Sequence, residues 1–190
     1  MKRKLSAAAL KRRARQVRLL LMDVDGVLTD GRLFYVPDGR GGVAETKGFD
    51  SHDGMALRWV QEAGIPVGWI SGREAPGVAE RAQILQIAYL YQNQLAKLGP
   101  YEEILKRSGV AEEQVCYIGD DLTDAPILKR VGLAVAVANA VPEVKALAHY
   151  VTRTPGGDGA AREVVELLLR AQDQWRAVLT KYGMDTQHRG

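Results

Sequence analysis

The amino-acid sequence predicts an α/β fold built on a doubly wound, mostly parallel sheet. Short apolar runs of strand character alternate with segments of helical character along most of the chain, an order typical of a parallel sheet with helices on both faces. The 190 residues are enough for one domain with a substantial core. Acidic clusters follow two of the strands, which places polar chemistry at one edge of the sheet.

Eight apolar runs bounded by turn residues are predicted to be strands. They cover residues 17–22, 33–36, 43–47, 66–70, 88–91, 115–118, 133–137 and 150–152. The second and third runs flank a loop rich in turn residues, Pro37-Asp-Gly-Arg-Gly-Gly42, so we expect a β-hairpin insertion over residues 31–47.

Helices are predicted between these strands, partly from proline and glycine signals at their ends. They cover residues 53–63, 76–85, 100–108, a stretch from about 122, 142–148 and 161–180. Pro76 and Pro100 suit first helical turns, and Gly64 ends the helix that precedes it. The helix over 161–180 is expected to close the fold.

The N-terminal segment is strongly basic. Eight of the 26 basic residues precede Asp23, which is the first acid of the chain. A basic arm is able to bind nucleic acid, but this one has no aromatic residue for base stacking, and its composition favours a solvated helix. We expect the arm over residues 1–16, a single domain over 17–182 and a flexible tail over 183–190.

Three features of the sequence bear on cellular location. No apolar run approaches the roughly 20 residues of a membrane span, and residues 5–10 are too short for the apolar core of a signal peptide. The single cysteine, Cys116, cannot form an internal disulfide and is expected to be buried in its strand. We therefore expect a cytoplasmic protein without a membrane partner.

Polar residues follow four predicted strands at the carboxyl ends, where ligands bind in such sheets. These residues are Asp23, Asp25, Ser71, Gly72, Lys97, Asp120, Asp121 and Asp124. Two acidic residues after a strand commonly do no more than cap a turn, so each motif taken alone is weakly informative. The convergence of four separate loops on one crevice is more specific.

This arrangement predicts a phosphatase that uses Mg²⁺ and an aspartate nucleophile. Asp23 is the candidate nucleophile, which attacks phosphorus to form an aspartyl-phosphate. Asp25 is expected to protonate the leaving alkoxide and then to deprotonate the attacking water. Mg²⁺ prefers hard oxygen ligands, and we expect Asp23, the backbone carbonyl of Asp25 and Asp120 to supply them.

The other residues of the crevice are expected to neutralise charge and to support the site. Lys97 would place a cation on the phosphoryl oxygens, and Ser71 and the backbone N–H of Gly72 would donate hydrogen bonds to them. Asp121 and Asp124, together with Gly72, are expected to support the catalytic groups.

The motifs resemble those of the haloacid dehalogenase superfamily, and more closely those of its 3-deoxy-D-manno-octulosonate 8-phosphate phosphatase family. The resemblance runs from about Ala14 to Ala171. The matching segments are Asp23-Val-Asp-Gly-Val-Leu-Thr-Asp-Gly31, Lys47-Gly-Phe49, Asp53-Gly54, Ile70-Ser-Gly-Arg73, Leu90-Tyr-Gln92, Lys97, Gly119-Asp-Asp-Leu-Thr-Asp124, Tyr150-Val-Thr-Arg153 and Gly156-Gly-Asp-Gly-Ala-Ala-Arg-Glu163.

The resemblance implies a Rossmann-like core without a cap domain, working as a homotetramer. In that family the hairpin packs in the tetramer centre, and the segment Gly156 to Arg162 helps cover the active site of a neighbouring subunit. The spacing also argues against a cap domain, because the segment between Asp25 and Ser71 holds only a hairpin and one helix. The expected substrate-binding residues are Thr29, His52, Arg73 and Arg162.

Three positions depart from the family pattern. His52 stands where arginine is usual, Asn93 where glycine is usual, and Gln86 replaces the glycine of a usual Leu-Gly pair. None of them removes a catalytic group. Neutral histidine cannot supply the bidentate fork of arginine to a sugar-acid carboxylate, so Arg73 and Arg162 are the other candidates for that contact.

The leading hypothesis is hydrolysis of 3-deoxy-D-manno-octulosonate 8-phosphate, which would serve lipopolysaccharide precursor synthesis. The same chemistry on a nonulosonate 9-phosphate or on a broader set of sugar phosphates is the nearest alternative. A non-catalytic oligomerisation module is a second, although the complete set of catalytic residues argues against it. A nucleic-acid phosphatase recruited by the basic arm is a third, and no nucleic-acid partner is expected.

Overall fold

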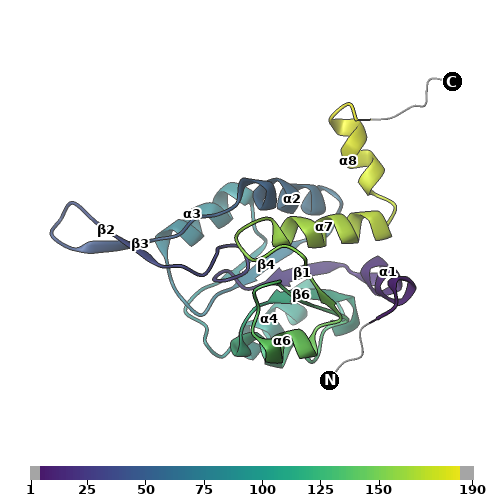
Figure 1. Ribbon diagram of the computed structural model, residues 1–190, viewed down its shortest axis with the longest axis horizontal. Coiled ribbons are helices and arrows are strands. Elements are labelled where there is room, and N and C mark those ends of the chain that lie inside the picture. The colour runs from purple at the N-terminus through teal and green to yellow at the C-terminus, as the bar shows by residue number, and fades with distance from the viewer. Residues whose placement is uncertain (1–4, 185–190) are drawn as a thin grey trace.

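The computed structural model describes residues 5–184 and has a parallel sheet of six strands at its centre (Figure 1). The strand order is β5 (Tyr89–Tyr91), β4 (Val67–Ile70), β1 (Leu19–Met22), β6 (Val115–Gly119), β7 (Leu133–Ala136) and β8 (Tyr150–Val151). Every residue of β1, β4, β6 and β7 is buried, as expected for strands covered on both faces. The predicted doubly wound α/β fold is confirmed.

Helices form a layer on each side of this sheet. The helices of the described residues are α1 (Ala7–Gln16), α2 (Ser51–Glu62), α3 (Pro76–Leu85), α4 (Leu98–Ser108), α5 (Ala125–Leu128), α6 (Pro142–Leu147), α7 (Ala160–Ala171) and α8 (Trp175–Lys181), with short 3₁₀ turns at Glu112–Gln114 and Leu122–Asp124. In Figure 1, α2, α3 and α7 lie above the strands and α4 and α6 below them. None of the described helices is long and apolar enough to cross a membrane.

The predicted hairpin is confirmed and projects away from the rest of the molecule (Figure 1). Strands β2 (Phe34–Pro37) and β3 (Val43–Thr46) pair antiparallel, with Phe34 opposite Thr46. Its apolar side chains are largely exposed: Phe34 by 50%, Tyr35 by 59% and Val43 by 67%. The hairpin therefore presents apolar surface that this chain leaves uncovered.

The predicted arm forms a helix packed on the body of the protein. Ser6 caps α1 by accepting a hydrogen bond from the N–H of Ala9, and Ala14 is completely buried. The guanidinium of Arg13 donates to the carbonyl of Gly132 at 2.5 Å. The first strand starts at Leu19 instead of Val17, because Val17 ends α1. Residues 1–4 of the arm and 185–190 of the predicted tail lie outside the described residues.

The single helix predicted over 161–180 is wrong, because the chain turns between α7 and α8. Asp173 has a left-handed backbone with φ of 61°. The side-chain amide of the neighbouring Gln172 donates hydrogen bonds to the backbone carbonyls of Ala14 and Val17. The turn folds α8 back so that Trp175 meets Trp59 of α2 edge to face at 5.8 Å. These distant contacts override the local helical pattern.

Candidate active site

A tight loop directly after β1 carries the first two carboxylates. The N–H of Asp23 donates to the carbonyl of Ile118 in β6, and the carbonyl of Val24 accepts from the N–H groups of Leu28 and Thr29. Val24 and Leu28 are buried in the core. Apolar anchors and backbone hydrogen bonds thus fix the loop at the carboxyl end of the sheet.

Asp124 organises the second acidic cluster after β6. Its Oδ2 accepts from the N–H groups of Asp120 and Asp121, and its Oδ1 accepts from the hydroxyl of Tyr117 at 2.7 Å. Asp121 in turn starts the 3₁₀ turn by accepting from the N–H of Leu122. Asp124 is completely buried, so it supports the cluster from within.

Lys97 joins the two clusters. Its Nζ lies 2.9 Å from Oδ1 of Asp23 and 2.7 Å from Oδ1 of Asp124, and the residue is only 2% exposed. Since both oxygens of Asp124 already have donors, Asp124 is best described as the group that holds Lys97 beside Asp23. Buried charges of this kind are tolerated when they are paired.

The third side of the crevice comes from the end of β4. The hydroxyl of Ser71 donates to Oδ2 of Asp25 at 3.3 Å. Gly72 follows in the same loop, where an added Cβ would lie 3.1 Å from Leu95. The structure thus brings together the side chains of Asp23, Lys97 and Asp120, and it pairs Ser71 with Asp25 of the loop that carries Asp23.

Asp23 and Asp120 form a pair of acids that fits a divalent cation. One carboxylate oxygen from each of Asp23, Asp120 and Asp124 lies within 4.8 Å of the others. Oδ1 of Asp120 is buried and has no hydrogen-bond partner. A buried carboxylate oxygen without a donor is costly in the free protein, and hard oxygen donors of this kind suit Mg²⁺.

The electrostatics of this pair also favour a bound cation. Burial raises the pKa of Asp23 to about 6, the charge of Asp124 adds to the rise, and Lys97 opposes it. Burial raises the pKa of Asp120 to about 8, with further increases from Asp23 and Asp124. Each negative charge is therefore disfavoured until positive charge beyond that of Lys97 enters the site.

Gly26 leaves the space in which the Asp120 carboxylate lies. A Cβ at this position would lie 2.1 Å from Oδ2 of Asp120, and the backbone φ is +89°. We expect Gly26→Ala to weaken Mg²⁺ binding by roughly 10- to 100-fold, as measured by calorimetric titration. Gly64→Ala is the matched control, because Gly64 has a similar φ of +84° but open space around it. Equal Mg²⁺ affinity in the two variants would contradict this role.

Known proteins resemble this chain along most of its length. Residues 85–164 match the haloacid dehalogenase-like hydrolase family. A 3-deoxy-D-manno-octulosonate 8-phosphate phosphatase from Yersinia pestis is 47% identical over 162 residues, which are 85% of this chain and 84% of that protein. The chain belongs to the 3-deoxy-D-manno-octulosonate 8-phosphate phosphatase family. It is a phosphoric monoester hydrolase, and the predicted family resemblance is confirmed.

Solved structures of this phosphatase family have the same fold. A structure of the phosphatase from Moraxella catarrhalis, in complex with magnesium ion, phosphate ion and KDO, is 34% identical, has a TM-score of 0.89 and covers 93% of this chain and 99% of that chain. The structure from Yersinia pestis is 44% identical with a TM-score of 0.86, covering 90% of each chain. The similarity in fold therefore extends over nine-tenths or more of each of these chains.

The structure places the predicted substrate-binding residues of this phosphatase in different surroundings. Arg73 lies beside Glu45 of the hairpin, with 3.4 Å between Nη1 and Oε2, and His52 is exposed on the first turn of α2. Thr29 is completely buried, and its hydroxyl bonds to the backbone of its own loop. The structure thus gives Thr29 a role in shaping the loop and does not place its hydroxyl at the surface.

The side chain of Arg162 contacts residues of helices α2 and α7, whereas the predicted site residues Asp23 and Asp120 lie in the loops after β1 and β6. Its Nε lies 2.9 Å from Oε1 of Glu166, and its guanidinium stacks over Trp59 at 4.6 Å. The backbone N–H of Arg162 donates to Oδ1 of Asp53, a buried acid whose pKa burial raises to about 6. Sequence analysis assigned no role to Asp53, which joins the start of α7 to α2.

The glycine-rich segment packs against the catalytic loop of its own chain. The N–H of Gly157 donates to the carbonyl of Val27, and a Cβ at Gly156 would lie 1.8 Å from the carbonyl oxygen of Gly26. Only glycine allows so close an approach of two backbones. The segment therefore supports the loop that carries Asp23 and Asp25.

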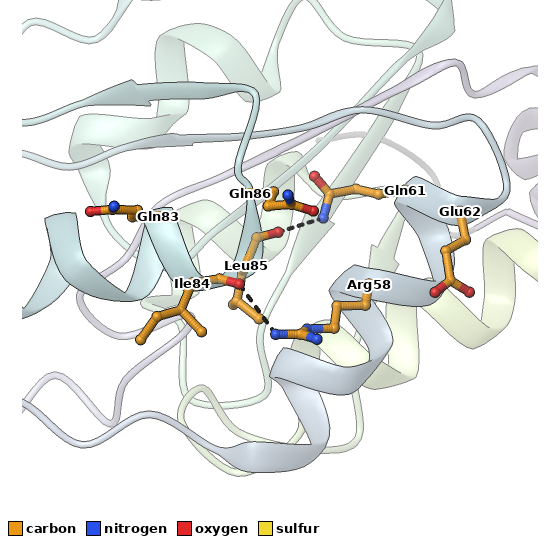
Figure 2. A pocket seen from close by; sticks show the side chains of 7 residues that line it. All are labelled: Arg58, Gln61, Glu62, Gln83, Ile84, Leu85 and Gln86. Atoms are coloured by element: carbon orange, nitrogen blue, oxygen red, sulfur yellow. Dashed lines mark hydrogen bonds between the residues drawn. The ribbon is translucent and has the colours of Figure 1, made fainter.

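Of the cavities outside the carboxylate cluster, two bear on the location of a substrate site. One of about 620 Å³ lies between α2 and α3, where Arg58 donates to the carbonyl of Ile84 and Gln61 to that of Leu85 (Figure 2). Its single acid, Glu62, pairs with Lys181 at 2.8 Å, so it lacks the groups that the chemistry needs. The other cavity, of about 400 Å³, adjoins the catalytic loop. Its lining residues are Asp30, Phe34, Gly48, Phe49, Asp50, Ser51 and Gly157.

Lys47 is a member of the site that sequence analysis did not assign. Its Nζ lies 2.6 Å from Oδ1 of Asp25 and 3.3 Å from Oε1 of Glu45. Only 3% of its side chain is exposed. The resemblance to the family included this lysine, but a lysine after a predicted strand gives no signal of its own that it contacts Asp25.

Proposed function

We propose that the protein hydrolyses 3-deoxy-D-manno-octulosonate 8-phosphate to the free sugar acid and phosphate, and that the reaction depends on Mg²⁺. The observation that carries the proposal is the cluster of the buried Asp23 and Lys97 with the partly buried Asp120 at the carboxyl end of the sheet. Relatives that share 44–47% of the sequence bear the name of this activity. Such a reaction would serve lipopolysaccharide precursor synthesis and would place the enzyme in the cytoplasm.

Asp23 would hold Mg²⁺ together with Asp120 and the backbone carbonyl of Asp25. The cation would supply positive charge to the phosphoryl oxygens. Lys97 lies beside Asp23 and adds a second positive charge, and Ser71 offers its hydroxyl to the same oxygens. Neutralisation of this kind is needed because a phosphate monoester dianion repels carboxylates.

The reaction would proceed in two steps. In the first, a carboxylate oxygen of Asp23 forms a bond to phosphorus, the bond from phosphorus to the sugar oxygen breaks, and Asp25 gives a proton to that oxygen. In the second, Asp25 takes a proton from water as the water oxygen bonds to phosphorus. The aspartyl-phosphate then breaks to release phosphate and restore Asp23.

The sugar acid would occupy the cavity of about 400 Å³ beside the catalytic loop. Arg73 and His52 are the candidates for contact with its carboxylate, since their side chains are 49% and 74% exposed. Arg73 lies beside Glu45 of the hairpin, and His52 lies on the first turn of α2. Thr29 would act through the loop conformation. Arg162 would have to leave its ion pair with Glu166 to reach a substrate.

A homotetramer is proposed as the working assembly. The exposed apolar side chains of the hairpin, Phe34, Tyr35, Val36 and Val43, support this proposal because a lone chain gains nothing from exposing them. Light scattering coupled to size exclusion measures the assembly, and a stable monomer at micromolar concentration would contradict it.

Phosphate release in the presence of Mg²⁺ tests the proposed substrate. The panel contains 3-deoxy-D-manno-octulosonate 8-phosphate, a nonulosonate 9-phosphate and several sugar phosphates without an acid group. A preference for the first supports the proposal, whereas preference for a substrate without an acid group would reassign the substrate. Absence of turnover on the whole panel would favour a non-catalytic oligomerisation module.

A further inference from the structure

We propose that Lys47, carried by the hairpin insertion, is a positioning residue for Asp25 and is needed specifically when the leaving group requires a proton. The inference rests on the proposed function, because it assumes that Asp25 is the acid in phosphate ester cleavage. It adds a role for a residue beyond the nucleophile, the acid and the cation ligands.

The two oxygens of Asp25 are contacted by residues that follow two different strands, β3 and β4. Nζ of Lys47 lies 2.6 Å from Oδ1, and the hydroxyl of Ser71 lies 3.3 Å from Oδ2. A single hydrogen bond would leave the carboxyl group free to rotate, whereas two contacts on different oxygens fix its plane. Because Ser71 is also expected to bind phosphoryl oxygens, Oδ2 is the oxygen that faces the reacting phosphate.

Lys47 itself is held firmly enough to act in this way. Its side chain is 3% exposed, and its second partner is Oε1 of Glu45 at 3.3 Å. The other oxygen of Glu45 faces Arg73 at 3.4 Å. A row of alternating charges therefore runs from Asp25 through Lys47 and Glu45 to Arg73. A buried ammonium group without these carboxylates would be strongly disfavoured.

The chemistry of the leaving group separates this role from a merely structural one. When the bond from phosphorus to a sugar oxygen breaks, the alkoxide needs a proton, and Asp25 is its proposed donor. When the ester is 4-nitrophenyl phosphate, the phenolate leaves without a proton. A misplaced Asp25 therefore slows the first reaction much more than the second.

Lys47→Met tests the inference through kcat/KM, which reports the steps up to loss of the leaving group. We expect kcat/KM to fall by about 10²-fold for the sugar-acid phosphate and by less than about 3-fold for 4-nitrophenyl phosphate. Lys181→Met is the matched control, because Lys181 forms an exposed pair with Glu62 away from the site. The control is expected to leave both values unchanged.

A double-mutant cycle shows whether Lys47 acts through Asp25. In an Asp25→Asn background, adding Lys47→Met is expected to change kcat/KM by less than about 3-fold, since the group that Lys47 positions is already lost. Glu45→Gln is a second variant for the case in which Lys47→Met does not fold. It removes one of the two charges that hold Lys47 and is expected to shift the ratio of the two substrates in the same direction, by less.

Equal losses of kcat/KM on both substrates, in Lys47→Met or in Glu45→Gln, would overturn the positioning role. A full additional loss in the Asp25→Asn background would also overturn it. Failure of the proposed function is distinguishable, because the wild-type enzyme would then not hydrolyse the sugar-acid phosphate at all.

Discussion

Asp23→Asn is expected to lower phosphate release by about 10⁴-fold or more, because the amide oxygen cannot replace the carboxylate as nucleophile. The variant should stay folded, since Lys97 keeps its 2.7 Å contact with the buried Asp124. Steady-state turnover with Mg²⁺ and a thermal melt of the same preparation measure the two properties.

The matched control for this variant is Asp173→Asn, which makes the same chemical change at an exposed position in the turn between α7 and α8. It is expected to keep wild-type turnover. Residual turnover above one per cent in Asp23→Asn, with a normal melt, would mean that another group attacks phosphorus and that Asp23 only binds the cation.

Mg²⁺ is expected to raise the melting temperature by roughly 5–10 °C at about 100 times its Kd. Ligand binding at this excess stabilises the folded state by about 2.7 kcal/mol, and a chain of this size gains roughly 2–4 °C per kcal/mol. Asp120→Asn should remove the increase, and Asp173→Asn should retain it. An unchanged increase in Asp120→Asn would place the cation elsewhere.

The same increase is expected to depend on pH. The pKa values of Asp23 and Asp120 rise from 3.8 to about 6 and about 8 on folding. The folded protein therefore holds more protons than the unfolded chain in this range, and without Mg²⁺ its stability falls as pH rises from about 4 to about 8. The cation binds the charged carboxylates, so the rise in melting temperature should grow from pH 5 to pH 8. A constant rise over this range would contradict these pKa shifts.

The sheet and the catalytic cluster were predictable because their signals are local. Asp23 and Asp120 follow short buried strands, and the carboxyl ends of parallel strands meet at one edge. The hairpin was predictable from Pro37 to Gly42, where turn residues interrupt two strand-like runs. Family motifs strengthened these expectations without being needed for them.

Other features depend on contacts between residues far apart in the sequence. The break after α7 carries no glycine or proline, and it follows from Trp175 meeting Trp59 and from Gln172 bonding to the end of α1. The contact of Lys47 with Asp25 joins residues separated by the whole hairpin. The inward position of Thr29 likewise depends on how its loop closes. No periodicity or spacing encodes such pairs.

The hairpin combines two duties in one short element. Its outer side chains are apolar and exposed, and the strand that returns to the body leads directly to Lys47, which holds Asp25. A substitution that adapts the insertion to a different neighbouring surface also shifts the anchor point of the acid. Under the proposed assembly and the proposed role of Lys47, divergence of subunit contacts and divergence of catalytic rate would be constrained to occur together, and the hairpin would change in sequence only where both are preserved.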